Sequence, residues 1–325
     1  MRTLVTGAGG YVGQRLVASL LRAGHEVVAT ARRPERLGAY DFAGRARLER
    51  LDADDAASCH HAVAGVQVAY YLVHGIGGAD YARTDRARAQ TFAVAARAAG
   101  VGRVVYLGGL VPRGEKLSEH LASRAEVGEV LGEHGPELVW LRAAVVLGAG
   151  SASYEITRYL GDWLPLIPLP PWMDTLVQPV AADDVLRALV AAAAHLPPGS
   201  YDLGGPERVP YAELVRRYLR VAGLHRVLAP TPPVPTRVAS WVVARLTPLP
   251  QDMVADLVLS LANTMVADTG PISAHLPGGA TSVDDALRRS RVGSHVRRSR
   301  LPGVCAAPDP LQLCATDADW AHRAR

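Results

Sequence analysis

A glycine-rich turn close to the start of the chain has residue types and spacing suited to holding phosphates. It reads Thr6-Gly7-Ala8-Gly9-Gly10-Tyr11-Val12-Gly13 and lies between a β-branched run and a stretch of helical period. Gly7, Gly10 and Gly13 suit, in turn, a tight turn, close approach of a pyrophosphate and close helix–strand packing. Free N–H groups at the helix start, around Tyr11 and Val12, would hold the diphosphate. A glycine-rich turn without a ligand is the alternative, but the position between strand and helix favours a dinucleotide site.

Positive charge ends the second expected strand, where the adenosine ribose of a dinucleotide would lie. The strand ends Thr30-Ala31-Arg32-Arg33, and no carboxylate stands between Glu26 and Glu35. An NAD site usually offers an acid about 20 residues after the loop, whereas a guanidinium group suits a 2′-phosphate. We therefore predict NADP(H) rather than NAD(H), with Arg32 and Arg33 beside the phosphate. Two surface residues of an arginine-rich chain are the alternative.

Three more strand ends complete the expected cofactor cleft. Asp52, followed by Ala53, closes the third strand and could accept a hydrogen bond from the adenine amino group, or serve as a plain turn residue. Leu72, Val73 and His74 close the fourth strand, and Gly108 lies at the end of the fifth. Ligands of parallel sheets bind outside the carboxyl ends of the strands, so we expect all of these residues beside the cofactor.

Short β-branched runs alternate with longer Ala-, Leu- and Arg-rich stretches through the first 150 residues. The expected strands are Thr3–Thr6, Glu26–Thr30, Arg47–Leu51, Val66–Val73, Arg103–Leu107 and Leu138–Leu141. The expected helices are Val12–Ala23, Ala56–Val63, Arg83–Ala99 and Glu119–Glu133. This rhythm is typical of βαβ units and predicts an α/β fold with a Rossmann-type, doubly wound parallel sheet.

Glycines follow several of the expected helices. Gly24, Gly65, Gly100 and Gly135 each stand just after a helical run. A residue that ends a helix in this way adopts a positive φ, which glycine tolerates best. We therefore expect a positive φ at all four.

The rest of the chain divides into three parts. Residues 1–150 should form the dinucleotide-binding core, completed within about 175–204 by strands Thr175–Pro179 and Gly199–Leu203 and helix Asp183–His195. Residues 151–174 and 205–290 should form a smaller, mainly helical substrate-side region, with helices over Tyr211–Ala222, Thr236–Leu246, Asp252–Thr264 and Ser282–Ser290. From residue 291 to 325 periodicity is weak, and we expect a mobile tail.

The segment after the sixth strand should border a substrate mouth. Ser151, Ser153 and Tyr154 could line it, although Ser153 could instead cap a helix that starts at Tyr154. Trp172 and Met173 follow a proline cluster and could form an apolar lid, or simply belong to the core. The acids Asp183 and Asp184 fit the first turn of a helix.

Composition excludes several classes of protein. The chain has 325 residues, 49% of them hydrophobic, and a net charge of +4 without a basic stripe in its body, which argues against disorder and against nucleic-acid binding. Its three cysteines show no C-x-x-C spacing, so we expect neither a disulfide framework nor a metal site. The start lacks the features of a signal peptide, and no apolar stretch reaches the roughly 20 residues of a membrane span. These features predict a cytoplasmic protein.

With these residues placed, residues 1–290 resemble the short-chain dehydrogenase/reductase superfamily, in its atypical or extended branch of NmrA-like NAD(P)-binding proteins. Besides the loop, the resemblance rests on the segments 71–74 (YLVH), 105–109 (VYLGG), 117–128 (LSEHLASRAEVG), 141–148 (LRAAVVLG), 178–185 (QPVAADDV) and 201–206 (YDLGGP). Active members use a Tyr that transfers a proton, a Lys four residues later and a Ser at the end of the fifth strand. The resemblance implies nicotinamide binding but names no substrate.

This chain departs from that catalytic set at all three places. The fifth strand ends Leu107-Gly108-Gly109 without a serine, and the single lysine, Lys116, has Pro112 four residues before it. His120 and Arg124 stand at the i, i+4 spacing where Tyr and Lys would be. A neutral imidazole can transfer a proton near pH 7, so His120 with Arg124 is a catalytic candidate. The alternative, which we favour, is that both are cleft-wall residues.

Two functions follow. The first is an NADP(H)-binding oxidoreductase-like protein acting on a small apolar carbonyl or alkene-type substrate without the Ser/Tyr/Lys set. The second is a non-catalytic protein in which bound NADP(H) reports redox state to a partner protein.

Overall fold

The computed structural model describes residues 1–75, 80–112, 114–273, 275–276, 278–294 and 309–323. Its centre is a seven-stranded parallel sheet in the order β11-β6-β5-β4-β1-β2-β3. The strands are β1 (Arg2–Val5), β2 (Glu26–Ala31), β3 (Arg47–Arg50), β4 (Val68–Tyr71), β5 (Arg103–Gly109), β6 (Glu137–Ala143) and β11 (Gly199–Leu203). The predicted Rossmann-type α/β fold is confirmed, with β11 as the seventh strand.

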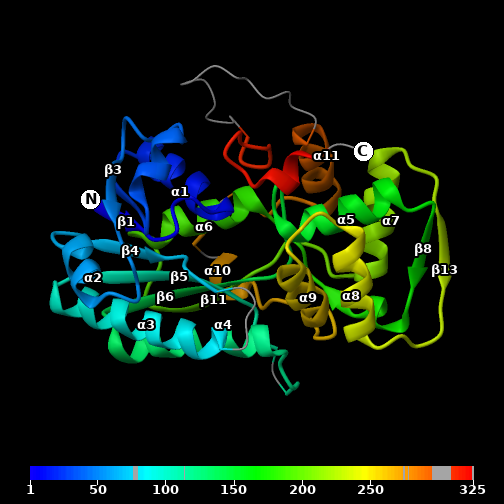
Figure 1. Ribbon diagram of the computed structural model, residues 1–325, viewed down its shortest axis with the longest axis horizontal. Coiled ribbons are helices and arrows are strands. Elements are labelled where there is room, and N and C mark those ends of the chain that lie inside the picture. The colour runs from blue at the N-terminus through cyan, green and yellow to red at the C-terminus, as the bar shows by residue number, and fades with distance from the viewer. Residues whose placement is uncertain (76–79, 113, 274, 277, 295–308, 324–325) are drawn as a thin grey trace.

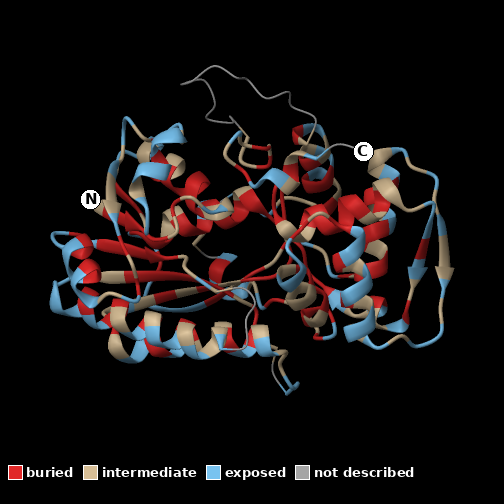
Figure 2. Ribbon diagram, in the orientation of Figure 1, coloured by how far each residue is buried: buried red, intermediate tan, exposed pale blue. Residues whose placement is uncertain are grey.

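Helices cover both faces of the sheet (Figure 1). One face packs against α2 (Ala56–Val63), α3 (Tyr81–Ala98) and α4 (Glu119–His134), and the other against α1 (Tyr11–Arg22) and α6 (Ala182–Ala192). Both faces of the central strands are therefore buried, as Figure 2 shows in red. This explains why these strands read as continuous apolar runs rather than as alternating patterns. Asp183 and Asp184 lie in the first turn of α6, as expected.

A mainly helical region stands beside the carboxyl edge of the sheet. Its helices are α5 (Ala152–Trp163), α7 (Tyr211–Ala222), α8 (Thr236–Leu246), α9 (Gln251–Ser260), α10 (Gly270–Ser273) and α11 (Val283–Gly293). Its short strands pair as β7 (Val146–Leu147) with β10 (Val180–Ala181), β9 (Leu176–Val177) with β12 (Val209–Pro210), and β8 (Leu166–Leu169) with β13 (Val227–Pro230). The 3-10 turns are η1 (Pro34–Ala39), η2 (Pro171–Asp174) and η3 (Asp319–His322). The expected strand Thr175–Pro179 is thus the short β9, outside the central sheet.

Two local expectations are wrong. Gly24, Gly65 and Gly100 have positive φ, but Gly135 has φ −88° and is extended. A Cβ at Gly135 would lie 2.5 Å from the Leu131 carbonyl oxygen, so close packing is what suits glycine there.

The start of α5 also differs from expectation. The helix begins at Ala152, and its cap is Ser151 rather than Ser153, with the Tyr154 N–H donating to Ser151 Oγ. Ser151 and Tyr154 are buried, whereas Ser153 lines a small space beside the residues that follow β6.

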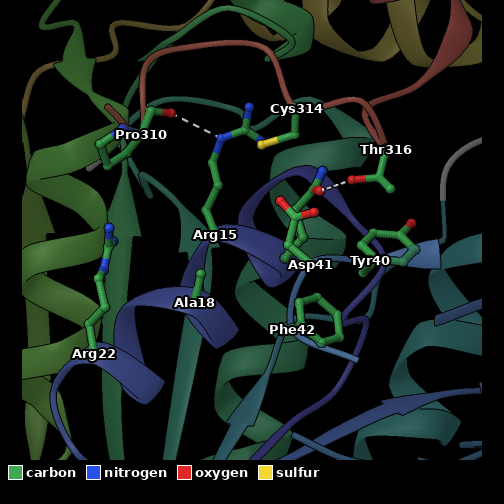
Figure 3. Close-up of a pocket in the computed structure, with 10 residues that line it drawn as sticks. Arg15, Ala18, Arg22, Tyr40, Asp41, Phe42, Pro310, Cys314 and Thr316 are labelled. Atoms are coloured by element: carbon green, nitrogen blue, oxygen red, sulfur yellow. Dashed lines mark hydrogen bonds between the residues drawn. The ribbon is translucent and has the colours of Figure 1, made fainter. Parts of the chain in front are cut away.

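The described C-terminal residues correct part of the expectation of a mobile tail over 291–325, of which residues 295–308 and 324–325 lie outside the described residues. Residues 291–293 continue α11, and residues 309–323 pack on α1. Arg15, which leaves α1 towards this segment in Figure 3, donates to both carboxylate oxygens of Asp317 at 2.7 and 2.8 Å and to the carbonyl oxygens of Pro310 and Gln312. The side chains of Arg15 and Asp317 are only 4% and 1% exposed. Weak periodicity concealed this segment because a buried ion pair and a few scattered apolar side chains, Leu311, Leu313 and Ala321, hold it in place without a regular apolar pattern.

Candidate cofactor and substrate site

The glycine loop leaves the start of α1 open to an anion. Gly7 has φ +62°, and its carbonyl oxygen accepts a 2.9 Å hydrogen bond from the Gly10 N–H, which closes the turn. A Cβ at Gly13 would lie 2.2 Å from that same oxygen, so only glycine allows this packing. The helix has no side-chain cap and no acid in its first turn. Its first N–H groups lack intrahelical partners and carry the positive end of the helix dipole.

A cavity of about 1080 Å³ lies beside this loop at the carboxyl edge of the sheet. The loop, η1 and the ends of β2, β3 and β4 form its walls. Nine predicted cofactor residues line it: Gly7, Gly10, Arg32, Arg33, Asp52, Ala53, Leu72, Val73 and His74. The sequence reasoning missed Gly9, Thr30, Ala31, Arg36, Leu37, Tyr40, Leu51, Gly75 and Arg88, which line it too.

Four predicted cofactor residues do not line this cavity. Tyr11 and Val12 border a separate small space next to α6, and the Tyr11 ring lies under the Arg15 guanidinium at 3.9 Å. Gly13 serves helix packing, as described above. Gly108 lies under Trp140, whose Nε1 would be 2.7 Å from an added Cβ. Packing therefore explains the glycine at position 108.

Three arginines in the cavity form no ion pair within hydrogen-bonding distance in the described part of the chain. Arg32, Arg33 and Arg36 are exposed, and within the described residues none of them forms an ion pair or a side-chain hydrogen bond. Arg88 differs, because it donates to both carboxylate oxygens of Asp54 at 2.7 and 2.8 Å. Arg36 could have been found from the sequence, since it follows Arg33 by one turn of η1.

The side chain of Asp52, the acid that follows β3, already interacts with neighbouring residues of the chain. Asp52 Oδ1 accepts a 3.2 Å hydrogen bond from the Asp54 N–H, and Oδ2 lies 3.5 Å from the Arg50 guanidinium. Asp52 therefore acts as a turn residue and also lines the cavity, so both interpretations of this residue describe part of its environment.

The loop and η1 are fastened to each other. The Tyr40 hydroxyl donates a 2.9 Å hydrogen bond to the Gly9 carbonyl oxygen. On the other side, the Leu72 N–H donates to Thr6 Oγ1 at 2.8 Å, which joins the ends of β1 and β4. These contacts hold the walls of the cavity in place.

The two catalytic candidates lie on α4, next to the end of β4. Arg124 donates a 2.8 Å hydrogen bond to the Leu107 carbonyl oxygen, and its own carbonyl oxygen accepts one from the Tyr106 hydroxyl at 2.9 Å. Arg124 is thus tied to β5. His74, which lines the cofactor cavity, interacts electrostatically with Arg124 and His120. His120 and Arg124 therefore lie near His74, although neither of them lines the cofactor cavity.

His120 faces an acid that sequence reasoning missed. Its Nδ1 lies 3.9 Å from Oδ2 of Asp256 on α9, and both atoms are buried without a hydrogen-bond partner in the described part of the chain. Burial, with Arg124 beside it, lowers the pKa of His120 to about 4. Burial, with Asp252 and Glu119 nearby, raises the pKa of Asp256. His120 is therefore neutral at pH 7.

Tyr81, at the start of α3, belongs to the same neighbourhood. Its hydroxyl is buried without a partner among the described residues, and burial, followed by the charges of Asp256 and Glu119, raises its pKa. No sequence signal marks Tyr81 or Asp256, because only the fold brings α3, α4 and α9 together.

Comparison with known proteins identifies the cofactor half. Residues 7–143 match the family model described as NAD(P)H-binding. That match starts at the first glycine of the loop and ends at the last residue of β6. Residues 7–143 of this chain are thus identified as an NAD(P)H-binding domain. The resemblance expected from the sequence is confirmed.

Individual relatives agree with this assignment. An uncharacterized protein of Mycobacterium tuberculosis is 30% identical over 246 residues, which is 74% of this chain but only 25% of that protein. The 2-alkyl-3-oxoalkanoate reductase of Stenotrophomonas maltophilia is 28% identical over 270 residues, 70% of this chain and 77% of that enzyme. A nucleoside-diphosphate-sugar epimerase from Staphylococcus aureus superposes with a TM-score of 0.72 at 15% identity, covering 89% of this chain and all of that one, which shows a shared fold.

The described residues were also compared with the requirements of membrane-spanning helices and of metal sites. None of the helices there is long and apolar enough to cross a membrane. Across the same residues, no cluster of three or more His, Cys, Asp or Glu side chains is placed to hold a metal ion.

Proposed function

We propose that this protein binds NADP(H) in preference to NAD(H) and uses it to reduce an apolar carbonyl or alkene-type substrate. The observation that carries the cofactor preference is the set of three unpaired arginines, Arg32, Arg33 and Arg36, in the wall of the cavity. A guanidinium group without an acidic partner is free to pair with a 2′-phosphate. No carboxylate ends β2 to accept hydrogen bonds from a 2′-hydroxyl instead.

The residues present fit a dinucleotide along the whole cavity. The uncapped start of α1 suits the diphosphate, Asp52 and Ala53 suit the adenine, and Leu72, Val73 and His74 suit the middle of the molecule. When bound, the nicotinamide would supply the hydride. Arg124, held by Leu107 at the end of β5, would offer a fixed positive charge to the ribose or phosphate.

The residues of this site are poorly suited to donating a proton at pH 7. His120 with a pKa of about 4 carries a proton in only about one molecule in a thousand at pH 7. No serine ends β5, and the sequence contains no Tyr-x-x-x-Lys pair. We therefore propose slow turnover, in which His120 is the proton donor and Asp256 orients its ring from 3.9 Å. The Stenotrophomonas relative, by its name, reduces an alkylated oxo acid, which supports an apolar oxo substrate.

The same weakness supports a second candidate function. A protein that binds NADP(H) tightly and turns over slowly can report redox state to a partner protein. The neutral, buried His120 and the missing Ser/Tyr/Lys set favour this alternative. The two functions differ in one measurable respect, which is whether any substrate is reduced at a rate above background.

Calorimetric titration tests the cofactor assignment. NADPH should bind about 10- to 100-fold more tightly than NADH, since a hydrogen bond to a charged group contributes roughly 1.5–3 kcal/mol. Arg32→Ala plus Arg33→Ala should remove this preference and leave NADH affinity unchanged.

The matched control removes the same charge elsewhere. Arg83→Ala plus Arg86→Ala takes two exposed arginines from α3 that pair with Asp80 and Glu126. This variant should keep the NADPH preference. Equal affinities of the wild type for the two cofactors would overturn the assignment.

A further inference from the structure

A second cavity, of about 390 Å³, lies in the helical region and is nearly all apolar. Its walls come from α5, β8, η2, α8 and α9, and its volume falls within the range of small-molecule sites. Pro168, Trp172 and Val258 are typical of its lining. Transfer of an apolar ligand from water to such a surface is favourable, so the cavity suits an apolar ligand.

The apolar face of α8 points to a ligand in this cavity. Ala239, Val242, Val243 and Leu246 line the space and follow the i, i+3, i+4, i+7 spacing of a core-facing stripe. Such a face is normally covered, yet Val242 and Leu246 remain 39% and 38% exposed. The stripe therefore borders both the cavity and its opening to solvent, so a ligand could enter beside α8.

The cavity continues towards the carboxyl edge of the sheet. A smaller space of about 70 Å³ shares Ile156, Tyr211, Val258 and Leu261 with it. The smaller space also touches Ala144 and Val145, the two residues that follow β6. The smaller space thus lies next to both the apolar cavity and the residues that follow β6 at the carboxyl edge of the sheet.

Helix α9 separates this space from His120. Val258 faces the apolar cavity, whereas Asp256 faces His120. Ser260, in the wall of the smaller space, lies 3.1 Å from the hydroxyl of Ser118, the residue that caps α4 two positions before His120. The start of α4 and the apolar cavity therefore lie on opposite sides of the last turn of α9.

We propose that this cavity binds the hydrocarbon body of the substrate, so that the protein acts on lipophilic carbonyl compounds with an extended alkyl chain. This inference rests on the proposed function for the reacting end only, because binding of the chain needs no reduction. Each methylene that enters the cavity should improve affinity about fourfold, equivalent to about 0.8 kcal/mol, until the space is filled.

The test measures binding and turnover separately in the full-length protein. Straight-chain 2-alkanones of four to twelve carbons compete with the neutral fluorescent probe N-phenyl-1-naphthylamine, and the same ketones are then followed at the NADPH absorbance. We expect affinity to rise with chain length and then level off. Affinity that does not change with chain length would overturn the proposal.

A matched pair of variants locates the binding. Ala239→Trp puts a large ring on the smallest side chain of the cavity wall, whereas Val238→Trp places the same ring on a neighbouring residue that is 50% exposed and outside the wall. Ala239→Trp should lose probe binding at least tenfold and keep NADPH affinity, and Val238→Trp should keep both. If both variants bind the probe as the wild type does, the cavity is not the site. The wild-type series decides the question even if Ala239→Trp does not fold.

The two proposals fail in different ways. Chain-length-dependent binding without NADPH oxidation contradicts the reductase and supports the cavity as a lipid site. NADPH oxidation that is independent of chain length supports the reductase and overturns the proposed role of the cavity.

Discussion

The cofactor cavity and the junction of α4 with α9 lie at the same edge of the sheet but are built by different means. The cavity is formed by backbone turns and by short contiguous segments at strand ends, such as Gly7 to Gly10 and Arg32 to Arg36. The junction is formed by single side chains, His120 and Asp256, which lie far apart in the chain. Binding of phosphates therefore depends on local geometry, whereas proton transfer depends on tertiary packing.

This difference explains how the cofactor cavity can match a general dinucleotide-binding pattern while the junction of α4 with α9 departs from the expected catalytic pattern. Backbone N–H groups bind a diphosphate whatever side chains surround them. A proton donor, in contrast, needs a suitable pKa, and burial of His120 shifts its pKa to about 4. The glycine loop thus suits a nucleotide, whereas His120, neutral at pH 7, would be a poor proton donor there.

The largest effect is expected from a side chain placed in the cofactor cavity. In Gly10→Val, the only heavy atom within 4 Å of the new Cβ, apart from the neighbouring residues, would be the Gly7 carbonyl oxygen at 3.3 Å, so the fold should survive. The side chain would occupy space needed by the pyrophosphate, and calorimetry should detect no NADPH binding. Gly44→Val, at a position with open space around it, is the control and should bind normally. Normal binding by a folded Gly10→Val variant would place the nucleotide elsewhere.

The next effect concerns the C-terminal segment on the other side of α1. Asp317→Ala leaves the Arg15 guanidinium buried without its partner, which should lower the free energy of unfolding by about 3–5 kcal/mol. Urea unfolding followed by circular dichroism measures the change. Asp319→Ala, an exposed neighbour, should change it by less than about 0.5 kcal/mol. Equal stability of the two variants would mean that the segment does not hold α1.

The sequence predicts which short segments meet in one cavity better than it predicts positions that depend on packing. The loop glycines Gly7 and Gly10, Arg32, Arg33 and the residues after β3 and β4 line that cavity, because each belongs to a short motif at the end of a strand. Gly108 was expected beside the cofactor but does not line the cavity, and the contact that suits a glycine there comes from Trp140 on the neighbouring strand β6.

Contacts between residues that lie far apart in the chain could not be predicted from the sequence, for the same reason. Asp256 meets His120, and Asp317 meets Arg15, only after the chain has folded. Neither pair has a spacing that a pattern could reveal, since its members belong to distant elements. The C-terminal segment was expected to be mobile because its anchoring acid could not be recognised.

The last prediction concerns the proton donor His120, and the expected effect depends on pH. If the imidazolium supplies the proton, turnover of a 2-alkanone should rise as the pH falls from 7 towards 4, by about tenfold per pH unit, because the protonated fraction rises in that way. His120→Gln should remove this rise and leave NADPH affinity unchanged. A steady-state pH profile of both proteins measures it. Turnover that is fast at pH 7 and survives the substitution would place the proton transfer on another residue.

The structure of the complex with NADPH tests the central claim most directly. We predict that the diphosphate lies on the first N–H groups of α1, and that the 2′-phosphate lies within 3.2 Å of a guanidinium nitrogen of Arg32, Arg33 or Arg36. The nicotinamide should lie next to His120 at the end of the cavity. A 2′-phosphate directed to solvent with no arginine in contact, or a nucleotide bound outside the cavity, would contradict the account.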